Sequence, residues 1–344
     1  MSFSNTLIYW YLQEKRELPW RKTRDPYLVW LSEIMLQQTR VAQGMAYYLK
    51  FSEAFPTIKD LAKAEESTVL KMWQGLGYYS RARNLHFTAK HIAFDLNEKF
   101  PNNYKDLLKL KGVGDYTASA IASFCFDEAA AVVDGNVYRV LARYFGIYTP
   151  INSTKGIKEF KQLAQSLIDA KQPGTFNQAI MDFGSLQCKP QNPNCEECPL
   201  NSSCVAFEKK SIKELPVKEK KLKVRKRFFN YLVFVTDDGK TILEERTGKG
   251  IWQGLYQFPL IESKKEISTE ELLSTEEFQQ KVPDASKLQL FNQEVIVHKL
   301  SHQHLYTRFW IVKLKKHPKA NVEWTEIEAF PVPVLISNFI EKFE

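Results

Sequence analysis

Four of the five cysteines in this 344-residue chain lie within one short stretch. They form a C-x6-C-x2-C-x5-C pattern at Cys188, Cys195, Cys198 and Cys204. Four cysteine thiolates are the ligands of an iron–sulfur cube, whereas structural zinc sites usually use closely spaced pairs of ligands. Disulfides are the second alternative, although they are rare in cytosolic proteins, which the rest of the chain resembles. The spacing therefore favours a [4Fe-4S] cluster. The fifth cysteine, Cys125, is expected in the core.

Two carboxylate residues have surroundings that suit acid–base chemistry. Glu33 lies among large apolar residues, and loss of water around a carboxyl raises its pKa into the range where it can donate a proton. A glutamate that points from its helix into solvent is the alternative. Asp134 directly precedes a helical pattern, where it could cap the helix or remain ionised on the floor of a pocket and face a cation.

These groups must be positioned by helices, because residues 7–207 repeat apolar side chains every three or four positions. Asp25 followed by Pro26 is a helix start. It predicts a helix over residues 27–41 that carries Glu33. Gln37, Gln38 and Thr39 follow within this predicted helix as a polar cluster, with Gln37 on the same face as Glu33.

Residues 104–124 have the pattern of a helix-hairpin-helix. The sequence predicts a short helix over 104–110, a tight turn at Lys111-Gly112-Val113-Gly114 and a second helix capped by Asp115. Glycines let backbone amides approach a phosphate closely, and the N-terminus of the following helix favours an anion. An ordinary turn between two helices is the alternative, because two nearby glycines are common.

The second part of the chain has a different pattern. Residues 208–227 contain ten Lys and Arg residues and few large apolar ones, which is typical of a linker. Residues 228–236 and 241–245 flank a turn and predict a β-hairpin. Further strands are expected at 293–299 and 305–314, and helices at 268–280 and 334–343. The predicted domains are therefore 1–207, all-α, and 228–344, α+β, joined by the linker 208–227.

Composition and charge indicate the class of partner. The formal net charge is +8 and the pI is about 9.0, which indicates an anionic partner, nucleic acid before membrane, because no lipid-anchoring motif accompanies the charge. The sequence contains no apolar run of about twenty residues and no secretory signal pattern. We therefore expect a soluble, intracellular protein that is not associated with a membrane. Our further expectations, which composition does not establish, are a monomer and a location in the bacterial cytoplasm in association with the nucleoid.

The hairpin, Asp134 and the cysteine loop, in this order, resemble the endonuclease III superfamily of base-excision DNA glycosylases. Residues 31–39, Leu-Ser-Glu-Ile-Met-Leu-Gln-Gln-Thr, resemble the MutY-type adenine DNA glycosylases within it. The resemblance covers almost the whole chain. It implies a multidomain fold, with an all-α helix-hairpin-helix glycosylase domain that carries an iron–sulfur cluster loop, followed by an α+β Nudix-like domain.

The resemblance also implies roles for individual residues. Glu33 would protonate N7 of an adenine that has been rotated out of the duplex, and Asp134 would stabilise the oxocarbenium ion by charge or by transient covalent attachment. Tyr116 and Asn136 would hydrogen-bond this centre. The other implied contacts are Trp20, Arg21, Leu36 and Asp182 around the adenine, Gln38, Thr39, Leu76 and the wedge Tyr78 at the lesion, and Gly112, Val113 and Gly114 on the DNA backbone.

The C-terminal part resembles the MutT-like module of the same family through residues 252–259, Trp-Gln-Gly-Leu-Tyr-Gln-Phe-Pro. The sequence lacks the acidic helix with which Nudix hydrolases bind metal, so we expect a lesion-recognition domain without hydrolase activity. In the family a Phe-Ser-His loop reads 8-oxoguanine opposite the adenine. Here Ser301 and His302 would have that role, and Leu300 departs from the usual Phe, which weakens the expected stacking or packing.

Two other functions stay open. A bifunctional endonuclease III-like pyrimidine glycosylase with AP lyase activity would carry a Schiff-base lysine just after the hairpin, where this chain has Tyr116. A non-catalytic iron–sulfur DNA-binding protein would not need both Glu33 and Asp134. The sequence therefore predicts a monofunctional adenine DNA glycosylase that acts on 8-oxoguanine:A or G:A mispairs in double-stranded DNA.

Overall fold

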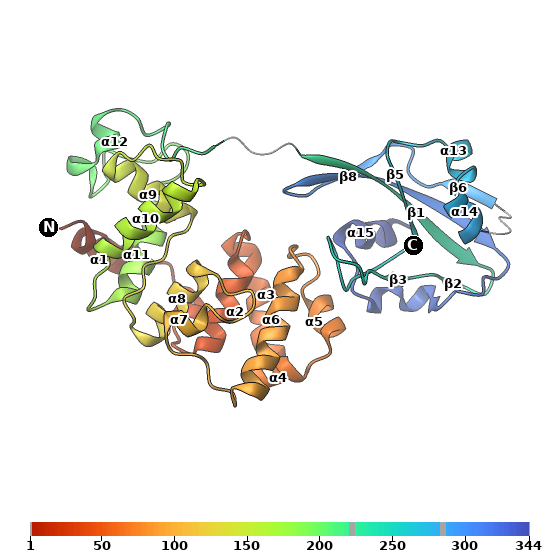
Figure 1. Cartoon of the computed structure of the whole chain (residues 1–344), viewed down its shortest axis with the longest axis horizontal. Coiled ribbons are helices and arrows are strands. Elements are labelled where there is room, and N and C mark those ends of the chain that lie inside the picture. Colours follow the sequence, from red (N-terminus) through yellow and green to blue (C-terminus); the bar gives the residue numbers. More distant parts are fainter. Residues whose placement is uncertain (1, 220–223, 283–286, 344) are drawn as a thin grey trace. The chain divides into compact units, whose positions relative to one another are not determined.

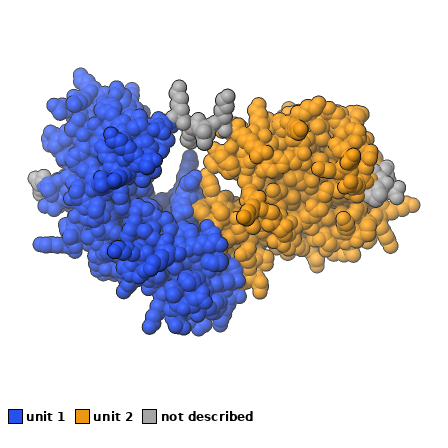
Figure 2. All heavy atoms as spheres, in the orientation of Figure 1, with its two compact units in different colours: residues 1–63, 84–220 blue, residues 64–83, 221–344 orange. Residues whose placement is uncertain are grey.

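The structure is a computed structural model that describes residues 2–219, 224–282 and 287–343 (Figure 1). It divides into two compact units, residues 1–63 with 84–220, and residues 64–83 with 221–344 (Figure 2). Residues 64–83, which the sequence predicts in the helical domain, group with the second unit. The predicted linker contains the boundary between the units, and its residues 220–223 lie outside the described residues. In the described parts of the chain, no helix is long and apolar enough to cross a membrane.

The first unit is helical. Its elements are α1 (Phe3–Glu14), η1 (Pro19–Arg21), α2 (Pro26–Leu36), α3 (Val41–Ala54), α4 (Ile58–Lys63), the later part of α6 (Ser80–Lys90), η2 (His91–Asp95), α7 (Tyr104–Leu107), α8 (Asp115–Phe126), α9 (Gly135–Phe145), α10 (Thr154–Leu167), α11 (Pro173–Leu186), η3 (Asn201–Ser203) and α12 (Val205–Glu208).

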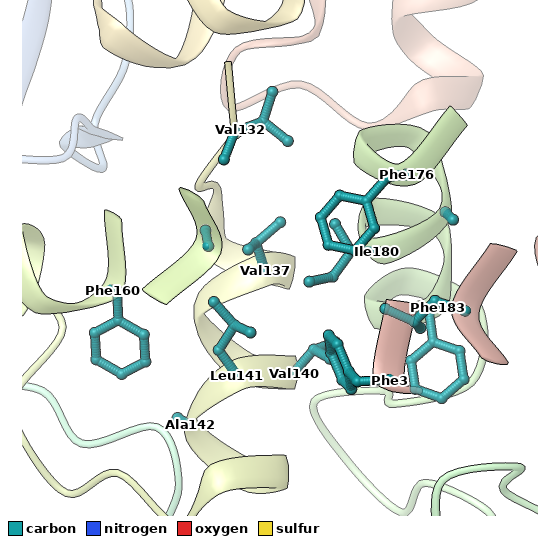
Figure 3. Packing of buried hydrophobic residues seen from close by; sticks show 14 of the residues in the cluster. Phe3, Val132, Val137, Val140, Leu141, Ala142, Phe160, Phe176, Ile180 and Phe183 are labelled. Atoms are coloured by element: carbon teal, nitrogen blue, oxygen red, sulfur yellow. The ribbon is translucent and has the colours of Figure 1, made fainter. Parts of the chain in front are cut away.

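Helix α9 is central to a core of this unit. Val137, Val140 and Leu141 recur at three- and four-residue spacing, so they share one face of the helix. That face packs against Phe160 of α10 and against α11, with all of these side chains buried (Figure 3). Burial of large apolar side chains contributes about 1.5–3 kcal/mol each, so this core fixes the start of α9, where Asp134 lies.

Helix α2 starts as predicted and ends earlier than predicted. The Asp25 carboxylate accepts a hydrogen bond from the Tyr27 N–H at 2.9 Å and caps the helix. The helix ends at Leu36, and α3 begins at Val41. The single predicted helix over 27–41 is therefore wrong. The reason is the backbone of Gln38, whose φ of 55° is left-handed and cannot continue a right-handed helix.

The helix-hairpin-helix forms from α7 and α8. Gly112 has a φ of 81°, a conformation that favours glycine, and a Cβ there would lie 2.7 Å from Cβ of Asn84. The N-cap of α8 is Gly114, and not Asp115 as predicted. Asp115 is the first helical residue, and its carboxylate accepts hydrogen bonds from the hydroxyl of Tyr104 and from Lys161.

The second unit is α+β. Its strands are β1 (Arg225–Thr236), β2 (Lys240–Thr241), β3 (Glu244–Glu245), β4 (Tyr256–Gln257), β5 (Leu260–Ser263), β6 (Lys287–Leu290), β7 (Ile296–Lys299), β8 (Gln303–Leu314) and β9 (Val322–Glu323). Within the described residues, the main sheet has the order β5-β1-β8-β6, and β7 also pairs with β8. Strands β1 and β8 run parallel, and β5 pairs antiparallel with β1.

The predicted hairpin over residues 228–245 does not form. Strand β2 has two residues and pairs with β9, while β1 pairs with β8 along its whole length and with β5 over residues 228–231. The helices of this unit are α5 (Glu66–Met72), the start of α6, α13 (Thr269–Leu273), α14 (Glu276–Lys281), η4 (Trp324–Ala329) and α15 (Val334–Phe343). The predicted helix over 268–280 is thus two helices, because Thr275 caps α14 anew. Helix α15 forms as predicted, and its Phe339 stacks on Phe309 of β8 with ring centroids 4.1 Å apart.

Candidate active site

Glu33 and Asp134 line the same cavity, which lies in the first unit and has a volume of about 540 Å³. Glu33 comes from α2, and Asp134 is the residue that precedes α9. A volume of this size can hold a purine and part of its sugar. Its other lining residues are Arg16, Leu18, Trp20, Arg21, Val29, Leu36, Thr39, Arg40, Val41, Tyr116, Phe124, Asn136, Gln178, Met181 and Ser185.

Glu33 is buried, with 7% of its surface exposed, so the solvent-facing alternative is wrong. Burial raises the pKa of its carboxyl to about 7, against the opposing effects of a hydrogen bond with Tyr116 and the charge of Arg21. About half of these carboxyls are therefore protonated at neutral pH. A carboxylic acid with this pKa can donate a proton to a bound base and be reprotonated between turnovers.

Asp134 is held in a different environment. Its Oδ1 accepts hydrogen bonds from the N–H groups of Asn136 and Val137, both at 2.8 Å, which caps α9 as predicted. Its Oδ2 accepts a third from the side-chain amide of Asn136, also at 2.8 Å. Burial raises the pKa of Asp134 above its usual value, and these hydrogen bonds and the charge of Arg139 offset only part of that increase. The three donors stabilise the ionised form.

Tyr116 lines the cavity and is close enough to both carboxyl groups to be affected by their charges. Its hydroxyl lies 3.3 Å from Sδ of Met181 and forms a hydrogen bond with Glu33 that lowers the pKa of this carboxyl. Burial and the neighbouring carboxylates raise the pKa of Tyr116 well above its usual value of 10. The hydroxyl therefore stays protonated and remains a hydrogen-bond donor in the cavity.

Asp182 is completely buried and does not line the cavity, in contrast to Trp20 and Arg21. Its carboxylate accepts hydrogen bonds from both nitrogens of the Arg21 fork, at 2.6 and 2.9 Å, and from Arg16. Arg16 also lines the cavity, and the sequence interpretation missed it. Asp182 thus acts behind the cavity and aims two guanidinium groups into it. A buried charge is stable only when it is paired. A charged residue that is expected to be buried is therefore the sequence feature that indicates such a network.

Arg139 connects the cavity with the cysteine loop. Its guanidinium donates to the carbonyl of Cys188 at 2.7 Å, to Oδ1 of Asn136 at 2.8 Å and to the carbonyl of Gly184. Asn136 in turn donates to Asp134. The sequence interpretation also missed this residue. The sequence feature that could have identified Arg139 is an arginine one turn after the helix cap, on a helix whose other face is apolar.

The four cysteines line a second, smaller cavity of the first unit together with Arg143. None of the five cysteines, all of which are described, is in a disulfide. Among the described residues, no group of three or more His, Cys, Asp or Glu side chains is arranged to hold a single metal ion. The four cysteines instead line the cavity. Burial raises the pKa of Cys198 to about 11, so its thiolate needs a positive metal centre to be stable.

Arg143 holds the start of the cysteine loop. It is 3% exposed and donates to the carbonyls of Leu215, Lys189 and Pro190 at 3.0, 2.7 and 3.1 Å, and to Sγ of Cys188 at 3.5 Å. Leu215 is buried, whereas Lys189 and Pro190 are exposed residues. The loop is therefore attached to α9 independently of the ligand that its thiolates bind.

Replacing Arg143 by Met should destabilise the protein by about 1–3 kcal/mol, the cost of leaving the buried carbonyl of Leu215 without its donor. Thermal unfolding followed by the visible absorbance of the cluster measures the effect. Arg24→Met is the matched control, since Arg24 forms an exposed ion pair with Asp127 and such pairs contribute about 0–1 kcal/mol. Equal losses for the two variants would contradict the role of Arg143.

The second unit has a pocket of its own, with a volume of about 400 Å³. Tyr78 lines it and is 45% exposed, with a left-handed φ of 49°. Ser301 and His302 line it too, in the turn between β7 and β8 that is closed by a hydrogen bond from the N–H of Leu300 to the carbonyl of Gln303. The other lining residues are Gly77, Tyr79, Ser80, Arg83, Gly250, Ile251, Trp252, Lys299 and Leu300.

The remaining residues predicted to contact DNA line neither the cavity of Glu33 and Asp134 nor the pocket of the second unit. Gln38 is exposed in the turn after α2. Leu76 is buried, at 6% exposure, beside the turn that carries Tyr78. Gly112 and Gly114 are at the hairpin, where a Cβ on Gly114 would meet no atom within 4 Å. The space beside Gly114 is therefore open, whereas that beside Gly112 is filled by Asn84.

Three parts of the chain match known families. Residues 31–172 match the HhH-GPD superfamily base excision DNA repair proteins, residues 188–204 the iron–sulfur binding domain of endonuclease III, and residues 230–342 the NUDIX domain. The middle match covers all four cysteines, whose thiolates suit a cluster and surround a cavity. The loop therefore holds a [4Fe-4S] cluster, as predicted, and when bound it ties four points of the loop together through iron–thiolate bonds.

Curated relatives match over most of the chain. The adenine DNA glycosylase of Buchnera aphidicola subsp. Schizaphis graminum is 38% identical over 263 residues, 76% of each chain. That of Buchnera aphidicola subsp. Baizongia pistaciae is 36% identical over 312 residues, 90% of this chain and 86% of the relative. A solved structure of a thermostable thymine-DNA glycosylase is 34% identical, covers 60% of this chain and 95% of its own, and has a TM-score of 0.56.

Proposed function

Because the chain belongs to the family of adenine DNA glycosylases, we propose that it removes adenine that lies opposite 8-oxoguanine or guanine in double-stranded DNA. It is a DNA glycosylase of base excision repair. The single observation that carries the proposal is the shared cavity of Glu33 and Asp134, in which one carboxyl has a pKa of about 7 and the other accepts three hydrogen bonds.

In the proposed reaction the adenine leaves the duplex and enters this cavity, at a cost of roughly a few kcal/mol for unstacking. Protonated Glu33 donates its proton to N7, so that the base departs as a neutral molecule and not as an anion. The burial of Glu33, which makes the acid form available at neutral pH, supports this step.

Asp134 would act on the sugar. Cleavage of the N-glycosidic bond leaves an oxocarbenium ion, and a carboxylate beside it stabilises the positive charge or bonds to it transiently. Water then completes the hydrolysis. The donors from Asn136 and Val137 support an ionised Asp134 in this role, and Tyr116 and Arg21 would keep Glu33 oriented.

Tyr116 also supports a monofunctional enzyme. A lyase would need an amine at this place in the cavity to form a Schiff base with the sugar, and the Tyr116 side chain carries a hydroxyl whose pKa is raised. We therefore propose base release without strand cleavage. We also propose that the partner is DNA and not a membrane.

Recognition of the oxidised base would belong to the pocket of the second unit. Tyr78 would insert beside the lesion, and Ser301 and His302 would hydrogen-bond the 8-oxoguanine that remains in the duplex. The lining of one pocket by these three residues supports the proposal. Leu300, in the same turn, would supply packing without aromatic stacking.

We expect release of free adenine to be fastest from 8-oxoguanine:A, slower from G:A and absent from T:A duplexes. Replacing Ser301 and His302 together by Ala should reduce the ratio of the 8-oxoguanine:A rate to the G:A rate by about tenfold. Hydrogen bonds that distinguish one base from another are worth about 1–3 kcal/mol. Single-turnover assays with each duplex measure the ratio. Ser274→Ala with His317→Ala, at residues outside the pocket, is the control. An unchanged ratio in the pocket variant would refute the reading role.

A further inference from the structure

The segment that leads to Asp134 is extended and buried, yet it is not part of a sheet. Residues 128–133 connect α8 with the cap of α9, and Ala130, Ala131 and Val132 are 7, 0 and 1% exposed. In the described structure they form no strand. Buried backbone N–H and C=O groups need partners, so the partners of this segment determine where it can lie.

Gln165 of α10 satisfies one edge of the segment. Its Nε2 donates to the carbonyl of Ala129 at 2.7 Å, and its Oε1 accepts from the N–H of Ala131 at 3.0 Å. A residue of a neighbouring parallel strand binds the same two groups, the C=O of one residue and the N–H two residues on. The side-chain amide thus replaces one peptide unit of a neighbouring strand.

Asn177 of α11 does the same on the opposite edge, one residue later. Its Nδ2 donates to the carbonyl of Ala130 at 2.8 Å, and its Oδ1 accepts from the N–H of Val132 at 3.1 Å. The second hydrogen of Nδ2 goes to Oγ of Ser123 in α8 at 2.8 Å. Asn177 is completely buried, so water cannot replace these bonds.

Lys161, one turn before Gln165, completes the set. Its Nζ donates to the carbonyl of Ala131 at 2.6 Å and to Ser119 at 2.9 Å, and pairs with Asp115 at the start of α8. The segment is therefore attached to α8, α10 and α11 by side chains. The side chain of Val132 lies in the core near Phe176 and Ile180 (Figure 3).

We propose that Asn177 and Gln165 are positioning residues for the reaction, because they set the register of the segment that delivers Asp134 to the cavity. Apolar contacts of Val132 fix how deep the segment lies, whereas the two amides fix its position along its own axis. The last of these bonds is made two residues before Asp134. A slip by a fraction of one residue, which spans about 3.3 Å in an extended chain, would displace the carboxylate.

The proposal rests on the proposed role of Asp134, and it is tested with DNA ligands that separate charge from shape. The first duplex carries a cationic pyrrolidine in place of the sugar of adenine, and the second a neutral tetrahydrofuran. A well-placed carboxylate binds the cation more tightly, as it would the transition state. The variants are Asn177→Leu, which keeps the branched shape of the side chain but removes its two bonds to the segment and the one to Ser123, and Gln165→Leu, at an exposed residue whose replacement spares the core.

Asn177→Leu should lose about tenfold or more of the preference for the cation and of the single-turnover rate, since displacement of a reacting group by about 1 Å can cost 100-fold. Gln165→Leu should lose a smaller but measurable part of both, because Gln165 is exposed and water can replace part of its bonding. Affinity for the tetrahydrofuran duplex should stay unchanged. Asn321→Leu is the matched control, because Asn321 bridges the N–H and C=O of Leu243 in the second unit; its preference for the cation should remain that of the wild type.

Folded variants that retain the wild-type preference and rate would overturn the proposal, and if Asn177→Leu does not fold, Gln165→Leu decides. A wild-type protein that does not prefer the cation would instead contradict the role of Asp134, while the rates of release would still decide whether the two amides matter to the reaction.

Discussion

Asp134→Asn should reduce the single-turnover rate of adenine release by about 1,000-fold, because loss of one preorganised electrostatic partner of a transition state costs about 100- to 1,000-fold and this one carries a full charge. The substitution is conservative in structure. Asn caps helices about as well as Asp, so the bonds from Asn136 and Val137 to Oδ1 can persist. The change therefore isolates the negative charge from the position of α9.

Asp25→Asn is the matched control for this experiment. Asp25 caps α2 in the same unit and accepts from the N–H of Tyr27, but it does not line the cavity. Its replacement should leave the rate within a factor of about two, as expected for a surface substitution. Affinity for the mispaired duplex should change little in either variant. A rate for Asp134→Asn close to that of the wild type would remove Asp134 from the mechanism.

Glu33→Gln should slow release by about 100- to 10,000-fold, the range for loss of a general acid. Glutamine has the same shape and can still accept from Tyr116, but it has no proton of suitable acidity to donate to N7. The exposed Glu53 of α3 offers the control Glu53→Gln. Rapid-quench assays at saturating enzyme separate this loss from any change in binding. Fast release by Glu33→Gln would show that the base departs without help from this carboxyl.

Several parts of the site could be predicted from the sequence because their causes are local. Asp25 with Pro26 marks a helix start, Asp134 is a cap of the same kind, and each accepts the expected backbone hydrogen bonds. The apolar neighbours of Glu33 in one helix indicate that it could be buried, but they leave a solvent-facing glutamate as the alternative, which the structure excludes. The four cysteines all lie in one loop, so their spacing can be interpreted without knowledge of the rest of the fold.

The parts that were predicted wrongly depend on partners far away in the sequence. Strand β1 pairs with β8, about eighty residues later, so the local turn signal at Gly239 does not make a hairpin. The end of α2 depends on the left-handed backbone of Gln38, which its residue type does not require. Asp182 lies outside the cavity lining, where it pairs with two arginines that are more than 160 residues earlier in the sequence. Arg139, Asn177 and Gln165 act through backbone carbonyls and amides, which leave no pattern in a sequence.

The most direct test of the account is the pH dependence of single-turnover adenine release from an 8-oxoguanine:A duplex. Glu33 acts in its protonated form, and its pKa is about 7, so the wild-type rate should fall about tenfold per pH unit above this pH. It should also fall at acid pH, where Asp134, whose pKa burial raises, takes up a proton and loses its charge. Glu33→Gln should be slow and should lack the decrease above neutral pH. A wild-type rate that stays constant from well below to well above neutral pH would contradict the claim that Glu33 supplies the proton.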